Sequence, residues 1–273
     1  MPAPVPVLPP PVEAVVARWL ALVDAARPGL VTGLHLRGGL CFGEWVAGQS
    51  DVDFVAVLAR RPDPGDVEAL VRAHAALREA CPSPSFDGMH VLAADLAGDP
   101  DDCPDVLCVL GGHVEVEGRE DLNPVAWTEL ATRGVTVRGT PAAELGVWTD
   151  DARLRAFTRE NLDSYWRATA EGLAAAVTSS TPAEAGREDV CRWCVLGVAR
   201  LDHLLVTGAL TTKSGAGRWA LGHHPARFGR VVAEALRLRD GGEPRYPATP
   251  EGVLERGRDV AAFTAYVVAA GTA

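Results

Sequence analysis

The hydrophobic pattern changes near residue 150, and no other feature of the sequence constrains the fold as much. Before this point, apolar runs with strand-like alternation are separated by turns and helical patterns, whereas after it only helical spacing remains. This order predicts an α+β domain, a mixed sheet with flanking helices, followed by an all-α helical bundle. The expected strands are residues 30–36, 51–58, 89–93 and 113–117. The expected helices of the bundle are residues 151–176, 186–206, 213–222, 225–239 and 250–270.

The domain boundaries follow from the same pattern. We expect a proline-rich arm over 1–11, which contains six prolines, then a first domain over 12–150 and a helical domain over 151–273. The first domain opens with a helical pattern over 12–26. Asp63-Pro64 and Thr249-Pro250 each resemble a helix start, with a capping side chain before a proline at the first helical position.

Composition limits the classes of function. The chain has 273 residues, 48% of them hydrophobic, as expected for a globular protein. Its net charge of −10 counts against a nucleic-acid binder and suits a cationic ligand. No secretory signal and no apolar run of membrane-spanning length is evident, so we expect a cytoplasmic protein that binds no membrane. The six cysteines are then expected to be reduced thiols.

Two acidic residues mark the second expected strand. Asp51 and Asp53 are two positions apart, so on a strand they project to the same side, while Val52 and Phe54 face the core. Two neighbouring carboxylates repel each other, and a bridging divalent cation relieves that repulsion. Mg²⁺ suits such a pair because it binds a few carboxylates and keeps positions for phosphate oxygens and water. The pair therefore predicts a magnesium site, although a solvated strand end has the same pattern.

A glycine pair lies twelve residues upstream of this aspartate pair. Gly38-Gly39 lets the backbone approach a ligand closely, and a short helix that starts there would direct its amides at a phosphate. Ser50 directly precedes the first aspartate. A strand, a glycine pair, a short helix and then Ser-Asp-x-Asp on the next strand form a nucleotidyltransferase arrangement.

On these residues the sequence resembles the aminoglycoside nucleotidyltransferases, in particular the streptomycin/spectinomycin adenylyltransferase branch. In the second half, CVLGVARLDHLLVTGALTTKSGAGRWAL is similar to the helical-domain signature of that branch. Residues 137–145 look like the segment that joins its two domains. The resemblance implies Mg²⁺- and ATP-dependent transfer of AMP to a hydroxyl of an aminoglycoside or aminocyclitol antibiotic, which confers resistance, in a cleft between a nucleotidyltransferase domain and a helical domain.

The resemblance also implies roles for individual residues. Asp51 and Asp53 would hold Mg²⁺, and Ser50 with the amides of Gly38 and Gly39 would hold the β- and γ-phosphates. Arg200 and Lys213 match basic residues that reach ATP from the helical domain; a helix-end cation and a solvated lysine are the alternatives for these two.

Two positions depart from the family pattern. The family has Gly-Ser where this chain has Gly38-Gly39, which removes one hydroxyl contact to phosphate. Asp87 lies nearest to the family's third carboxylate, a glutamate that acts as metal ligand or general base, but its side chain is shorter. His90 is a competing base because imidazole titrates near neutral pH, and Asp87-Gly88 is also read as a simple turn.

Three further residues are expected at the antibiotic. Glu188 and Asp189 match acidic positions of the family that contact the cationic substrate, although acids are also favoured at a helix N-terminus. His113 falls near a family aromatic residue that contacts substrate, and a solvated strand edge is the alternative.

The predicted activity is therefore adenylyl transfer by a monomeric enzyme. A nucleotide-binding pseudoenzyme remains open, because Gly-Ser is missing and the third carboxylate is uncertain. A nucleotidyltransferase that acts on a non-antibiotic metabolite or on a protein also remains open.

Overall fold

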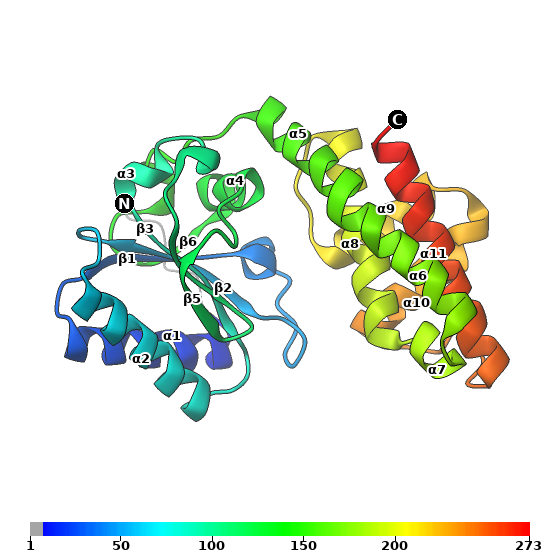
Figure 1. Cartoon of the computed structure of the whole chain (residues 1–273), viewed down its shortest axis with the longest axis horizontal. Coiled ribbons are helices and arrows are strands. Elements are labelled where there is room, and N and C mark those ends of the chain that lie inside the picture. Colours follow the sequence, from blue (N-terminus) through cyan, green and yellow to red (C-terminus); the bar gives the residue numbers. More distant parts are fainter. Residues whose placement is uncertain (1–7) are drawn as a thin grey trace. The chain divides into compact units, whose positions relative to one another are not determined.

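The structure is a computed structural model that describes residues 8–273 (Figure 1). Contacts divide the chain into two compact units, 1–150 and 151–273, and each unit is described by itself. Most of the expected proline-rich arm, residues 1–7, lies outside the described residues. The arm is shorter than expected, because Pro10 and Pro11 already belong to helix α1 (Pro10–Ala26), where proline is tolerated in the first turn.

Unit 1 contains a six-stranded sheet with the order β5-β4-β3-β2-β1-β6. Only β2 and β3 pair in parallel, and the other neighbours are antiparallel. The mixed sheet with flanking helices is thus confirmed. The strands are β1 (Val31–Arg37), β2 (Val52–Leu58), β3 (Phe86–Leu92), β4 (Val106–Leu110), β5 (His113–Gly118) and β6 (Val135–Arg138).

Both faces of the central strands are covered. Phe54 of β2 packs in one core with Trp19 and Leu70, so helices α1 and α2 cover that face. Val55, the next residue of β2, packs in a second core with Trp127 of α4 on the opposite face. Figure 1 shows the same arrangement, with α1 and α2 on one side of the sheet and α3 and α4 on the other. The alternating faces of β2 thus fix which side of the sheet each polar residue reaches.

Capping side chains define where the helices of unit 1 begin. The Asp63 carboxylate accepts a hydrogen bond from the Asp66 amide (2.9 Å), so the cap expected from Asp63-Pro64 is confirmed. Asn123 caps α4 in the same way through the amide of Ala126. The remaining helices of this unit are α2 (Pro64–Ala80), α3 (Ala93–Leu96), α4 (Pro124–Arg133) and the 3₁₀ turns η1 (Gly38–Phe42), η2 (Pro100–Asp102) and η3 (Ala142–Glu144).

The sequence pattern missed strands β4 and β6 and helices α3 and α4 of unit 1. Strand β4 is apolar on both faces, so it lacks alternation, and β6 has only four residues. Because Val135–Arg138 pairs with β1, the first residues of the segment 137–145 belong to the sheet and not to a connection between domains. The pattern also placed β3 three residues too late, since Phe86, Asp87 and Gly88 are part of it.

Unit 2 is all-α, as expected. Helix α8 (Glu188–Thr207) packs against α9, α10 and α11, and its apolar face contributes much of the core. Thr249 caps α11 through the amide of Gly252, which confirms the second predicted cap. In residues 8–273 no helix has both the length and the apolar character needed to cross a bilayer. The other helices are α5 (Asp151–Asn161), η4 (Leu162–Trp166), α6 (Arg167–Ser179), α7 (Pro182–Ala185), α9 (Lys213–His223), η5 (Ala226–Phe228), α10 (Gly229–Asp240) and α11 (Pro250–Gly271).

Buried histidines in the α1/α2 core make stability depend on pH. Burial lowers the pKa of His90 to about 4 from 6.5, and burial also lowers the pKa of its neighbour His74. Between pH 6.5 and 4 the unfolded chain binds a proton at His90 that the folded chain does not bind. The free energy of unfolding therefore falls as the pH decreases through this window.

We predict that His90→Gln weakens this pH dependence. His90 accounts for about 2 kcal/mol of the loss in unfolding free energy between pH 7 and pH 5, because only the unfolded state is charged there. Urea titrations at both pH values should show a difference about 2 kcal/mol smaller in the variant than in the original protein. Equal differences in the two proteins would contradict this assignment.

Candidate active site

Strand registry brings the predicted catalytic residues of unit 1 to one end of the sheet. Asp53 lies directly opposite Asp87 in the parallel β2–β3 pair and directly opposite Arg37 in the antiparallel β1–β2 pair. Asp87 shares its face of β3 with Met89, which packs in the same core as Val55, two residues after Asp53. Asp53 and Asp87 are therefore neighbours on the α4 face of the sheet, and Asp51 directly precedes β2.

The turn after β1 is shaped around the carboxylate of Asp53. Gly38 has φ of +68°, in the left-handed region that favours glycine. A Cβ at this position would overlap the carboxylate of Asp53. At Gly39 a Cβ would lie 2.8 Å from the carbonyl oxygen of Glu44. Neighbouring atoms thus leave no room for a side chain at either glycine. The 3₁₀ turn η1 begins at Gly38, where the motif predicted a short helix.

Arg37 is a buried charged residue of this cluster that the sequence pattern did not identify. Its guanidinium is buried and forms ion pairs with Asp121 and with Glu129, the latter at 3.2 Å. The backbone of Asp121 has φ of +67°, a conformation that is uncommon for residues other than glycine. The available signal was an arginine at the end of an apolar strand, directly before the glycine pair, where a buried charge needs partners.

The electrostatics of this cluster favour a bound cation. Burial raises the pKa of Asp53 to about 6, and the charges of Asp121 and Glu129 act in the same direction, while Arg37 opposes them. One guanidinium thus faces three acids, and Asp51 adds a further negative charge. The residues present therefore fit Mg²⁺, which prefers carboxylate oxygens and would offset this excess of negative charge.

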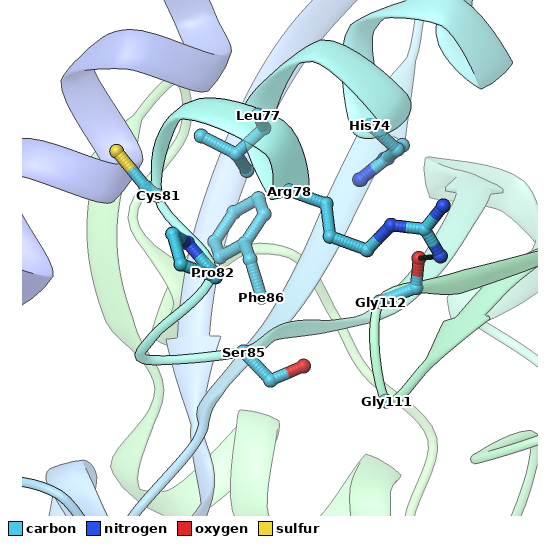
Figure 2. Close-up of a pocket in the computed structure, with 9 residues that line it drawn as sticks. All are labelled: His74, Leu77, Arg78, Cys81, Pro82, Ser85, Phe86, Gly111 and Gly112. Carbon is cyan, nitrogen blue, oxygen red and sulfur yellow. Dashed lines mark hydrogen bonds between the residues drawn. The ribbon is translucent and has the colours of Figure 1, made fainter.

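Two hydrogen bonds hold the carboxylate of Asp87. The hydroxyl of Ser85 donates to Oδ1 at 2.6 Å, and the amide of Gly112 donates to the same atom at 3.0 Å. Both donors also line a cavity of about 290 Å³ between α2 and the β4–β5 turn, where Arg78 donates to the carbonyl of Gly112 (Figure 2). The side chain of Asp87 is thus held in place by a strand end and a hairpin.

His90 is not part of this cluster. Its imidazole lies on the α1/α2 face, where it contacts Trp19, Phe54 and His74, and Nδ1 donates to the carbonyl oxygen of Leu107 at 2.9 Å. Asp87 lies on the other face of the same strand. The competing general base is therefore placed in a core and away from the carboxylates.

Ser50 and His113 lie at the edges of the cluster. The Ser50 hydroxyl accepts a hydrogen bond from the Val46 amide at 3.0 Å, which closes the turn before Asp51. His113 starts β5, directly after Gly112, and its Nδ1 lies 3.4 Å from Arg78. The β4–β5 hairpin, whose Gly112 amide donates to Asp87, therefore also carries the exposed imidazole of His113.

The predicted phosphate-binding cations belong to unit 2. Arg200 is half-buried in α8, and within residues 8–273 its guanidinium forms no ion pair. Lys213 is the first residue of α9, whose N-terminus is capped by Thr212 through the Gly215 amide. A half-buried guanidinium without an acidic partner is suited to an anionic ligand.

The two predicted substrate acids already have arginine partners in unit 2. Glu188 lies 3.3 Å from both Arg237 and Arg256, which also bind the buried Glu234. Asp189 pairs with Arg187, and both of these side chains are exposed. Arginines within the same unit thus offset both charges, and contact of these two acids with a cationic substrate stays a prediction.

Comparison with known proteins finds a family match in the helical unit. Residues 161–269 match the family model "Aminoglycoside adenylyltransferase, C-terminal domain". The matched residues all lie in unit 2, so this comparison concerns the helical unit alone. No curated protein matches the chain.

A solved structure with the same fold extends the similarity across both units. The crystal structure of spectinomycin adenyltransferase AAD(9) from Enterococcus faecialis, solved with ATP and spectinomycin, is 13% identical in sequence with a TM-score of 0.61. The match covers 93% of this chain and 99% of that chain. At this identity the match establishes the fold, so the solved structure shares the α+β unit followed by a helical unit.

A pair of glycine substitutions separates backbone strain from the contact with Asp53. Gly38 and Gly43 have similar φ values, +68° and +73°, but a Cβ at Gly43 would meet no atom within 4 Å. Gly43→Ala should lower the free energy of unfolding by about 1 kcal/mol through left-handed strain alone. Gly38→Ala should lower it by roughly 1–3 kcal/mol more, because the carboxylate of Asp53 must move. Urea unfolding measures both, and equal losses would mean that the turn does not depend on Asp53.

Proposed function

We propose that this protein is a nucleotidyltransferase that moves AMP from Mg²⁺-ATP to a hydroxyl of an aminoglycoside or aminocyclitol antibiotic. The observation that carries this proposal is the registry that sets Asp53 opposite Asp87, beside a glycine turn that closes over Asp53. Two carboxylates on neighbouring strands provide both a metal site and a base, which are the two requirements of phosphoryl transfer to a hydroxyl. The match of residues 161–269 to an aminoglycoside adenylyltransferase domain supports this class of acceptor.

The nucleotide is proposed to bind at the end of β1 and β2. Asp51 and Asp53 would hold Mg²⁺, which when bound polarises the α-phosphate and neutralises the departing pyrophosphate. The amides of Gly38 and Gly39 and the hydroxyl of Ser50 would hold the β- and γ-phosphates. The Ser50 oxygen already accepts from Val46, so its own proton remains available to donate to a phosphate oxygen.

Asp87 is proposed as the general base. The acceptor hydroxyl loses its proton to Asp87 as its oxygen forms a bond to the α-phosphorus, and the bond between that phosphorus and the β-bridging oxygen breaks. Ser85 and Gly112 both donate to Oδ1 of Asp87, so these bonds fix the orientation of the carboxylate that would accept the proton. Asp87 could also contribute a third oxygen to the metal site, as the family resemblance implies.

Cations of the helical unit are proposed to complete the nucleotide site. Arg200 and Lys213 would bind the triphosphate, whose negative charge favours a guanidinium and an ammonium. The role of Arg200 is supported by its half-buried position without an ion pair in the described residues.

The acceptor is proposed to be cationic. A chain with net charge −10 attracts polyamine-like antibiotics, which become concentrated at an acidic surface. Asp189 and His113 are the proposed contacts, because exposed ion pairs such as Arg187–Asp189 are worth little and exchange readily for a ligand. Glu188 would contact the substrate only with the exposed part of its side chain, since it also pairs with Arg237 and Arg256, which bind Glu234.

Modification of the antibiotic hydroxyl would confer resistance, and we place the enzyme in the cytoplasm, where ATP is available. All six cysteines are free thiols in the structure, as suits a reducing compartment.

The direct test is a substrate panel. Purified protein is incubated with Mg²⁺-ATP and streptomycin, spectinomycin or related compounds, and each product is examined by mass spectrometry. We expect one AMP to be added to at least one acceptor, with equimolar release of pyrophosphate. AMP transfer to a protein or to a cellular metabolite, with none to any antibiotic on the panel, would contradict the proposed acceptor class.

Asp53→Asn should abolish AMP transfer, with a fall in kcat of at least about 1,000-fold, because the metal site loses a carboxylate. Because the pKa of Asp53 is raised by burial and by neighbouring acids, its replacement should leave the free energy of unfolding in urea within about 1 kcal/mol of the original protein. Asp102→Asn, at an exposed aspartate outside the cluster, is the matched control and should retain activity. Retained turnover in Asp53→Asn would refute the metal assignment.

A further inference from the structure

A group of side chains of the types that ligate metals lies in unit 2, far along the sequence from the aspartate pair. Asp202 projects from α8, His223 is the last residue of α9, and His224 caps the same helix. One ligand atom from each of these three residues lies within 4.8 Å of the other two. The group thus combines two imidazoles with one carboxylate, from two helices that pack against each other.

The two inner members of this group are buried and incompletely bonded. The side chains of His224 and Asp202 are only 4% and 7% exposed, and Nε2 of His224 lies 3.4 Å from Oδ2 of Asp202. Even so, Nε2 of His224 has no hydrogen-bond partner within the described part of the chain. A buried polar atom without a partner is costly, so its position calls for an explanation.

The spacing of these atoms suits a tetrahedral metal centre. Zinc binds histidine nitrogen and carboxylate oxygen at about 2.0–2.2 Å. At a tetrahedral angle, two ligands at such distances stand about 3.3–3.5 Å apart. The separation of 3.4 Å between His224 and Asp202 therefore matches two corners of a zinc tetrahedron without any movement.

We propose that Asp202, His223 and His224 bind a divalent transition-metal ion, for which Zn²⁺ is the best match. Imidazole nitrogen favours zinc, nickel, cobalt or copper over magnesium, so this site differs in chemistry from the all-carboxylate cluster of unit 1. Three protein ligands leave a fourth position for water.

The surroundings position the two imidazoles and leave a route of entry. Trp219 stacks on His223 at 4.2 Å between ring centroids, and Phe263 and Tyr266 meet the ring of His224 edge-on. His223 itself is exposed, so its ring can close over an ion that enters from solvent. The bound ion would tie the end of α9 to α8, and its role is structural.

Metal binding is tested with the full chain, free of any histidine tag and stripped of metal. Zn²⁺ is titrated by calorimetry in the presence of saturating Mg²⁺, which occupies carboxylate sites, and Co²⁺ is then used as a spectroscopic probe. We expect one Zn²⁺ per chain, a higher Tm with zinc, and the intense visible absorption of tetrahedral Co²⁺. Absence of saturable zinc binding, or only the weak absorption of octahedral Co²⁺, would overturn the proposal.

Substitutions identify the ligands. His223→Asn changes an exposed side chain, so the fold should be retained, and zinc affinity should fall by roughly 100-fold as one ligand is lost. Asp202→Asn should have a similar effect. His203→Asn is the matched control, because His203 lies beside Asp202 in sequence but its Nδ1 is bonded to the carbonyl oxygen of Ala209 at 2.9 Å. Unchanged zinc affinity in His223→Asn, or an equal loss in His203→Asn, would refute this set of ligands.

Discussion

The repulsion among acids at one end of the β1–β2–β3 sheet governs the chemistry of unit 1. Asp53, Asp121 and Glu129 gather around a single buried guanidinium, that of Arg37, so negative charge exceeds positive charge before any ligand is counted. Removing charged groups from water is expensive unless they are paired. A folded chain can retain such an excess if a cation or a cationic ligand is available to offset it, and this condition links the packing of the sheet to its proposed activity.

Strand pairing makes this concentration of charge possible. Because β2 and β3 run in parallel, both strands begin at the same edge of the sheet, and their first acidic residues meet there. Because β1 runs antiparallel, its last residue, Arg37, reaches the same edge and leads directly into Gly38. One parallel and one antiparallel pairing therefore bring together residues 37, 53 and 87, which no local pattern connects.

The sequence predicted the features of the fold and of this site that depend on neighbouring residues in the chain. Alternation correctly placed Phe54 in the core and Asp53 on the opposite face, and the caps at Asp63 and Thr249 followed from single side chains. Pairing partners depend on residues far apart in the chain, so the role of Arg37 and the ion pair with Glu129 on α4 could not be predicted. The acids at the start of α8 illustrate the same limit, because Arg237 and Arg256 bind Glu188 from helices 49 and 68 residues away.

The glycine at position 39 gives a physical reason for one departure from the family pattern. The family resemblance would place a serine there, with its hydroxyl at a phosphate. In this chain the amide of Glu44 donates to the carbonyl of Gly39 at 3.0 Å, and the carbonyl oxygen of Glu44 occupies the space that a Cβ would need. This reciprocal contact closes the turn tightly and excludes any side chain. The proposed phosphate binding at this turn would then rely on backbone amides and on Ser50, whose hydroxyl proton is still available to donate.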